Sequence, residues 1–176
     1  MAHEPIHPSF DFSDKGRGYA DLATSLHSLL EAERNLIANL ANTAALIYHA
    51  LPDLNWAGFY LIGPNAQNVA TPELILGPFQ GKTACVRIAI GKGVCGTAAA
   101  TRETQLVPDV HAFPGHIACD SASNSEIGIP MIFSNGPRRG ELLGVLDLDS
   151  PLLGRFDEQD QRGLEAIVDI LMKSFE

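Results

Sequence analysis

The sequence predicts an α+β fold, in which one antiparallel sheet of roughly six strands has helices packed on it. Apolar residues repeat at helical spacing over 19–51 and again after Asp157, near the C-terminus. The region between them carries short strand-like runs instead, and two of these runs, 127–133 and 141–150, are close enough to form a hairpin. Hairpin-linked strands pair antiparallel, and helices from both chain ends can then cover the apolar face of the sheet.

The terminal helices are predicted from their apolar stripes and from their ends. Pro52 stops the second helix, and Asp157 followed by Asp160 predicts a capped start for the last helix. The stripes of the first two helices are Leu22, Leu26, Leu29 and Leu30, and then Leu36, Ile37, Leu40, Ala44, Ile47 and Leu51. The last helix carries Leu164, Ile167, Val168 and Leu171.

The strands are predicted from short aromatic and aliphatic runs between turn residues. These runs are 55–62, 73–79, 85–90, 104–107, 127–133 and 141–150. An alanine-rich stretch, 94–103, predicts a short helix between the third run and the fourth.

Two segments lack such periodicity. Residues 1–16 predict a loose N-terminal segment, followed by a single domain over 17–176. Residues 108–126 form a long loop rich in Pro, His and Ser, and loops of that length in compact domains are often functional.

Composition excludes several classes of partner. The net charge of −9 and the scattered basic residues argue against nucleic acid, which requires a basic face. No apolar run approaches the ~20 residues that cross a bilayer, so we expect no membrane partner. The N-terminus lacks the cationic start and apolar core of a secretory signal. Together with three cysteines, an odd number, this predicts reduced thiols and a cytoplasmic location.

The stretch GKGVCG, residues 91–96, matches the G-x-G-x-x-G pattern of dinucleotide sites. That pattern normally opens a βαβ unit, whereas the surrounding strands are predicted to be hairpin-linked. A tight turn into a helix is the favoured interpretation. Under either interpretation, free backbone N–H groups at the helix start could hold a small anion such as a carboxylate.

The three cysteines, Cys85, Cys95 and Cys119, have spacings that fit no common zinc site, so we expect no metal. Each can be a small core residue. Cys95 lies where a helix N-terminus would lower the pKa of its thiol. Cys119 lies in the long loop, three residues after His116, and is expected to be accessible. A cysteine that is oxidised to sulfenic acid needs a second thiol to resolve it, and this chain has two others.

Strand alternation groups the carboxyl residues with one another and the aromatic residues with one another. Strand alternation places Asp147 and Asp149 on the same face, and Glu126 stands at the entrance of the neighbouring strand. These acids form either an exposed sheet face or a pocket for a substrate ammonium, with one carboxyl kept protonated as a general acid. Alternation also places Trp56 and Tyr60 together, as core residues or as an aromatic wall.

Four stretches resemble the free methionine-(R)-sulfoxide reductases, which are single-domain proteins of the GAF fold. They are NWAGFYL, GPFQGKTACVRIAIGKGVCGTAAA, PDVHAFPGHIACDSASNSEIGIPM and GVLDLDSP. The resemblance runs in order from about residue 20 to the C-terminus. The GAF fold that it implies has a roughly six-stranded antiparallel sheet with helices packed on it, in agreement with the pattern of elements.

The resemblance implies an oxidoreductase that reduces free, not protein-bound, methionine-R-sulfoxide and so repairs oxidative damage. It implies Cys119 as the nucleophile, Cys85 as the resolving thiol and Cys95 as an alternative disulfide partner. The acidic pocket of the family corresponds to Glu126, Asp147 and Asp149, and its aromatic residues correspond to Trp56 and Tyr60. A thioredoxin-like dithiol would reduce the resulting disulfide, and no metal or organic cofactor is needed.

Two other classes of function are compatible with a GAF fold. One is a small-molecule-binding or redox-sensing module without turnover, since fold alone does not fix function. The other is a structural dimerisation domain, which would leave the acidic face and the Cys119 loop without a role. GAF domains frequently pair through terminal helices, so a homodimer is a family-level expectation.

Overall fold

The computed structural model describes residues 9–67, 71–115 and 121–176 and confirms the α+β fold. Its helices are α1 (Lys15–Leu30), α2 (Leu36–Ala50), α3 (Gly93–Thr101) and α4 (Glu158–Lys173), with one short 3-10 helix, η1 (Val110–Ala112), in the described residues. Its strands are β1 (Trp56–Pro64), β2 (Pro72–Gly81), β3 (Arg87–Ala89), β4 (Gln105–Val107), β5 (Ser125–Ile132) and β6 (Leu142–Ser150). None of the helices described has the length and hydropathy that a bilayer span requires.

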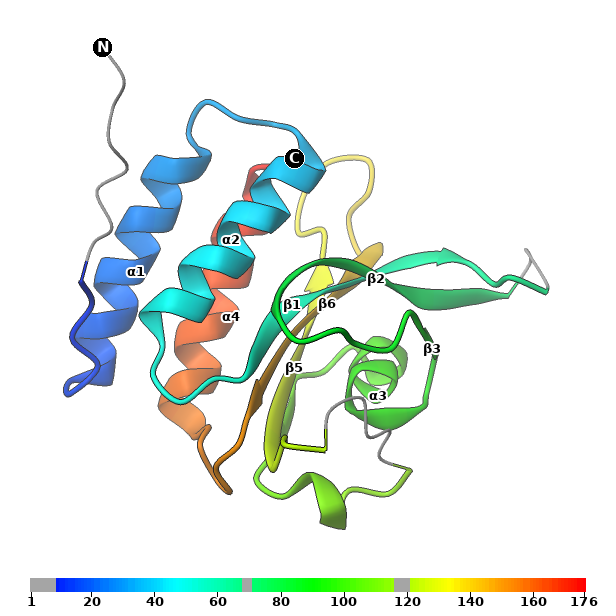
Figure 1. Cartoon of the computed structure of the whole chain (residues 1–176). Helices are drawn as coiled ribbons and strands as arrows, with labels where there is room; N and C mark the ends of the chain where they lie inside the picture. The colour runs from blue at the N-terminus through cyan, green and yellow to red at the C-terminus, as the bar shows by residue number, and fades with distance from the viewer. Residues whose placement is uncertain (1–8, 68–70, 116–120) are drawn as a thin grey trace.

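The strands form one antiparallel sheet in the order β3-β2-β1-β6-β5-β4. The hairpins β1–β2 and β5–β6 meet in the middle, where β1 pairs with β6, so the expected hairpin near the C-terminus is confirmed. Helices α1, α2 and α4 gather on one side of the sheet, whereas α3 lies on the other (Figure 1). Among the described residues, three α-helices therefore cover one face of the sheet, and one α-helix, α3, covers the other.

Some element ends differ from the sequence prediction. Helix α1 begins at Lys15 instead of near Tyr19, because the Asp14 side chain accepts a hydrogen bond from the N–H of Arg17 and caps the helix. Strand β5 begins at Ser125, two residues before the apolar run, because its polar start also pairs with β6. The division of the chain at residue 17 stays a prediction.

The main core lies between the sheet and helices α1, α2 and α4. Leu22, Leu26 and Leu30 of α1 are buried in it, as expected. Leu29 is 43% exposed and Ile37 is 57% exposed, so the predicted stripes were wrong at these two positions. In α1 the contacts are mainly with α4, so only one row of residues four apart is covered and Leu29 falls beside it.

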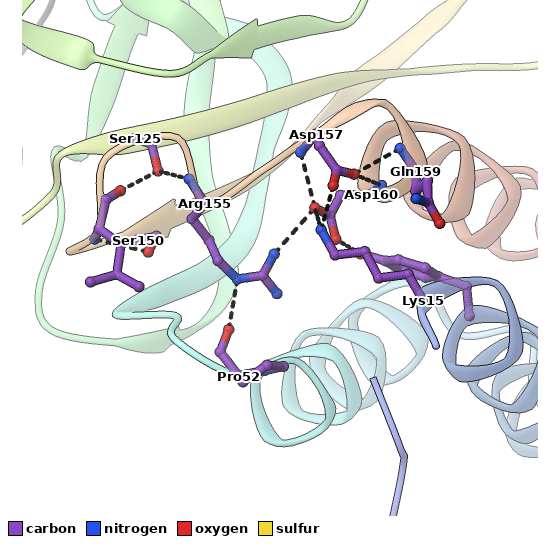
Figure 2. Close-up of polar contacts among 10 residues, drawn as sticks. Lys15, Pro52, Ser125, Ser150, Arg155, Asp157, Gln159 and Asp160 are labelled. Carbon is purple, nitrogen blue, oxygen red and sulfur yellow. Dashed lines mark hydrogen bonds and ion pairs between the residues drawn. The ribbon is translucent and has the colours of Figure 1, made fainter. Parts of the chain in front are cut away.

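A buried carboxylate, Asp160, ties the two ends of the chain together. The predicted cap of α4 is present: Asp157 accepts backbone N–H bonds, and Asp160 accepts the N–H of Asp157 in return. The other Asp160 partners are Lys15 Nζ at 2.6 Å, Arg155 Nη1 at 3.2 Å and the Tyr19 hydroxyl at 2.9 Å. Figure 2 shows Lys15 reaching this carboxylate from α1 and Arg155 reaching it from the loop before α4.

Candidate active site

A pocket lies on the face of the sheet that α3 covers. Strands β1, β5 and β6 form its floor, and the first turn of α3 forms one wall. The predicted acids and aromatic residues that line it are Trp56, Tyr60, Glu126, Asp147 and Asp149, and Cys95 lines it as well. The structure thus brings together six of the eight site residues that the sequence analysis named.

The strand register places Asp149 at the centre of one cross-strand row of this pocket. Asp149 of β6 pairs with Glu126 of β5 on one side and with Trp56 of β1 on the other. Residues directly opposite each other in antiparallel strands point to the same face. The row therefore delivers two carboxyls and an indole to one side of the sheet.

Asp147 lies two residues along β6, between Gly58 of β1 and Gly128 of β5. A side chain at Gly58 would collide with the Cβ of Phe79 and with the Trp56 ring. The Oδ1 atom of Asp147 is buried without a hydrogen-bond partner among the described residues. A buried carboxylate oxygen without a donor is unfavourable unless a ligand supplies one.

Glu126 and Asp147 are both buried, with 8% and 5% of their surface exposed, respectively. Burial, followed by the charges of Asp147 and Asp149, raises the pKa of Glu126 well above its usual value. Burial also raises the pKa of Asp147 to about 6, against the opposing effect of hydrogen bonds from Glu126 and Cys95. No cation among the described residues pairs with either group. The interpretation of these two acids as an exposed sheet face is therefore wrong.

Cys95 lies in the first turn of α3, buried and with a free thiol. Its Sγ donates to Glu126 Oε1 over 3.8 Å. The expectation of a lowered pKa was wrong: burial, and then the charges of Asp147 and Glu126, raise the pKa of this thiol well above its usual value. The helix N-terminus favours the thiolate only modestly, whereas the loss of water around the sulfur and the two adjacent acids disfavour the thiolate more strongly.

Cys95, Glu126 and Asp147 are the group among the described residues whose atoms could hold a metal ion, since their ligand atoms lie within 4.8 Å of one another. The raised pKa values of the thiol and of Glu126 favour their protonated forms, whereas a metal ion binds the deprotonated forms. We assign no metal to this group, and the expectation that none is needed stays a prediction.

The aromatic residues form both core and pocket wall. Trp56 stacks between Tyr60 and Phe79, with ring centroids 5.9 and 5.3 Å away. The Trp56 Nε1–H donates to the carbonyl of Lys82, and the Tyr60 hydroxyl donates to the carbonyl of Cys85. These two bonds hold the segment that carries Cys85 against β1.

Sequence reasoning missed Phe79, Lys92 and Ser123. Phe79 stacks on Trp56, while Lys92 and Ser123 line the pocket. The position of Phe79 in an alternating strand could have indicated it, because it pairs with Gly58 in the register. Lys92 lies within the glycine stretch but was not singled out, and Ser123 gives no signal of its own in the loop sequence.

The glycine stretch forms a tight turn into α3, as favoured. The Gly91 N–H donates to the Gly96 carbonyl, and no side chain in the described part of the chain caps the helix at Lys92. The surrounding strands are antiparallel, so the stretch does not open a βαβ unit and the dinucleotide interpretation is wrong. The helix start instead faces the acidic pocket with Lys92, Gly93 and Val94 among the lining residues.

Cys85 and Cys95 are in different states: Cys85 is disulfide-bonded, whereas Cys95 is a free thiol. Cys119 and His116 lie outside the described residues. The assignment of Cys119 as the nucleophile therefore stays a prediction.

The sheet and its pocket are those of a GAF domain. Residues 20–175 match this domain family. The free methionine-R-sulfoxide reductase of Escherichia coli is 49% identical over 160 residues, which cover 91% of this chain and 90% of that protein. The chain belongs to the family of free methionine-R-sulfoxide reductases.

Two solved structures are also similar. The free methionine-R-sulfoxide reductase of Neisseria meningitidis, in complex with its substrate, is 43% identical with a TM-score of 0.84, covering 97% of this chain and 96% of that one. A protein from Burkholderia vietnamiensis described as a putative GAF sensor is 55% identical with a TM-score of 0.82, covering 92% of this chain and 95% of that one.

Proposed function

We propose that this protein reduces free L-methionine-(R)-sulfoxide to L-methionine, with thiols as the source of electrons. The observation that carries the proposal is the buried pair Glu126–Asp147, which has raised pKa values and no cation beside it in the described residues. Such a site favours a ligand that brings a positive charge and needs a proton. The relatives named for this activity support the same substrate.

The pocket supplies a complementary group for each end of a free amino acid. The acids Glu126, Asp147 and Asp149 would neutralise the α-ammonium, and the uncapped start of α3 offers N–H groups for the α-carboxylate. Trp56 would form an apolar wall for the side chain. A methionine sulfoxide within a peptide has neither backbone charge, which explains the selectivity for the free amino acid.

The reaction begins with attack of the Cys119 thiolate on the sulfoxide sulfur. Oxide is a very poor leaving group, so the sulfoxide oxygen must accept a proton, and Glu126 or Asp147 would supply it. The attack forms a bond between the two sulfur atoms. As the protonated oxygen is transferred to Cys119, the sulfur–oxygen bond of the substrate and this sulfur–sulfur bond both break, which leaves a sulfenic acid on Cys119 and releases methionine with its sulfur reduced.

Cys85 would then resolve the sulfenic acid by forming a disulfide with Cys119 and releasing water. Its disulfide-bonded state and the burial of free Cys95 support Cys85 over Cys95 as the resolving thiol. An external thioredoxin-like dithiol would reduce that disulfide and return both cysteines to thiols. The same proposal includes a cytoplasmic location, where such reductants are kept reduced, and a homodimer as the assembled state.

The test is turnover of the separated R and S sulfoxides, each free and N-acetylated, with a thioredoxin system as reductant. Only the free R sulfoxide should be consumed over many turnovers. Consumption of the N-acetylated form at an equal rate would contradict the ammonium site, and absence of turnover would contradict the reductase assignment.

Two variants assign the thiols in the same assay. Cys119→Ser should abolish reduction, and full activity in it would remove Cys119 as the nucleophile. Cys85→Ser should complete about one turnover and then stall with thioredoxin as donor. Sustained cycling of Cys85→Ser would indicate Cys95 as the resolving thiol.

A sensing module is the second candidate function, and the GAF sensor description of the Burkholderia structure favours it. A sensor would bind free methionine sulfoxide through the same acidic pocket but would not consume it. Calorimetric binding to wild-type protein without loss of sulfoxide in the turnover assay would favour this alternative.

A further inference from the structure

Cys95 has no step of its own in the proposed reaction, although it lies inside the pocket. Cys95 is 2% exposed, and its Sγ lies 3.8 Å from Glu126 Oε1. A role for this thiol other than disulfide formation rests on the proposed function, because the acid pair that it contacts would deliver the proton.

The surroundings of Cys95 oppose oxidation of its sulfur. The thiolate is the form that attacks a disulfide or a sulfenic acid, and burial next to acids disfavours that form. Burial, and then Asp147 and Glu126, raise the pKa of the Cys95 thiol well above its usual value. The sulfur therefore keeps its proton and acts as a hydrogen-bond donor.

The backbone fixes this donor in place. The N–H of Lys92, at the N-cap of α3, donates to the Ala89 carbonyl, and the Gly91 N–H donates to the Gly96 carbonyl. A side chain at Gly96 would collide with the Ala89 carbonyl oxygen, so α3 starts in close contact with the end of β3. Cys95 lies within this clamped turn and points its thiol at the floor of the sheet.

The thiol meets acceptors on two strands. Glu126 on β5 accepts from Cys95, and Asp147 on β6 also interacts with it. The other titratable groups that line the pocket in the described residues are Tyr60 on β1, Asp149 on β6 and Lys92 at the start of α3. Hydrogen-bond donation to a carboxylate favours its charged form, so the thiol opposes the burial and charge repulsion that favour the protonated form.

We propose that Cys95 is a positioning residue, whose thiol proton holds the Glu126 carboxyl against Asp147 and sets when this pair releases its proton to the sulfoxide oxygen. The thiol itself is not oxidised during turnover. A donor of similar size, such as a serine hydroxyl, can replace it, whereas a methyl group cannot.

The first test is the pH dependence of kcat/KM for free methionine-R-sulfoxide in Cys95→Ala and Cys95→Ser. Loss of the donor in Cys95→Ala should move the alkaline limb upward by on the order of one pH unit. It should also raise KM about tenfold near neutral pH, because the pair then holds less negative charge for the ammonium. Cys95→Ser should keep the wild-type profile and cycle with thioredoxin.

The control is Ala99→Gly, one turn further along α3. Ala99 is 4% exposed and belongs to the same hydrophobic cluster as Cys95, so the variant loosens α3 without removing a donor. Its pH limbs should stay where the wild type has them. Equal shifts in Ala99→Gly and Cys95→Ala would overturn the proposal, and so would a stall of Cys95→Ser after one turnover.

The second test does not depend on activity. The chain has a single tryptophan, Trp56, which lines the same pocket, so its fluorescence can report protonation of the acid pair. The midpoint of the fluorescence titration should rise in Cys95→Ala but not in Cys95→Ser or Ala99→Gly. Identical midpoints in all variants would overturn the proposal. A shifted midpoint together with an inactive wild type would refute the proposed function alone.

Discussion

Two buried aspartates of this protein, Asp160 and Asp147, have opposite surroundings. Asp160 is fully buried and accepts hydrogen bonds from Lys15 and Arg155 (Figure 2). It also accepts one from the Tyr19 hydroxyl. Asp147 is 5% exposed and has a second acid, Glu126, as its neighbour, with no cation beside it in the described ranges. The same side chain is neutralised by the protein in one place and left uncompensated in the other.

The difference separates a structural carboxylate from a functional one. Removing water from a charge is unfavourable, and the protein offsets this at Asp160 with two cations, Lys15 from α1 and Arg155 from the loop before α4. At Asp147 the loss of hydration is not offset by a cation in the described residues. Burial raises the pKa of this carboxyl, and its Oδ1 atom has no hydrogen-bond partner there. A ligand that brings an ammonium group can supply what the fold omits there.

Asp160→Asn should lower the free energy of unfolding by about 3–5 kcal/mol, because it leaves Lys15 and Arg155 without their shared buried partner. Urea denaturation measures this loss. The matched control is Asp157→Asn in the same cap: its ion pair with Lys15 is half exposed and asparagine caps helices well, so about 1 kcal/mol or less is expected. Equal losses in the two variants would contradict the contrast between buried and exposed pairs.

Asp147 should make stability depend on pH in the opposite sense to a paired acid. Its pKa is raised from 3.8 to about 6, so between these values the native state binds more protons than the unfolded state. Its contribution to the free energy of unfolding therefore decreases as pH rises through this window, by about 3 kcal/mol in full. In urea denaturation between pH 4 and pH 7, the free energy of unfolding of Asp147→Asn should therefore increase relative to that of the wild type, by about 3 kcal/mol over the full range. A constant difference across this range would contradict the raised pKa.

The same Asp147→Asn change should lower kcat/KM for free methionine-R-sulfoxide about 100-fold, since the amide offers neither negative charge nor a transferable proton. Steady-state kinetics with a thioredoxin system measures the loss. Asp149→Asn is the matched comparison on the same face of β6, and its more exposed carboxyl predicts a loss of only about tenfold. Unchanged kinetics in both variants would return the two acids to a purely structural role.

Lys15→Met should lower the free energy of unfolding by about 1 kcal/mol, because Asp160 keeps Arg155 while a partly exposed partner is lost. Thermal or urea denaturation measures the change. Arg17→Met is the control on the same helix: the Arg17–Asp21 pair is 3.9 Å apart and well exposed, so no measurable loss is expected. A larger loss in Arg17→Met than in Lys15→Met would contradict the ranking of these pairs by burial.

Features that depend on residues close together in the chain were predicted well from the sequence. The 3.6-residue spacing gave α1, α2 and α4, and Asp157 with Asp160 gave the cap of α4. Period-two alternation correctly grouped Asp147 with Asp149 and Trp56 with Tyr60, and the structure brings both pairs to one pocket. The exposed Leu29 shows where this kind of prediction fails, because an apolar stripe does not show how much of its width a neighbouring helix will cover.

Local patterns in the chain were enough to predict the α+β class, the identities of the pocket acids and a helix start after the glycine stretch. The folded arrangement was needed to show that Glu126 is opposite Asp149, that Gly58 and Gly128 flank Asp147, that Cys95 is buried against these acids, and that the helix start lies beside them. The physical reason is that helix and strand periodicity act between near neighbours in the chain. Burial and charge at a site depend instead on strand register and on which segment covers the sheet.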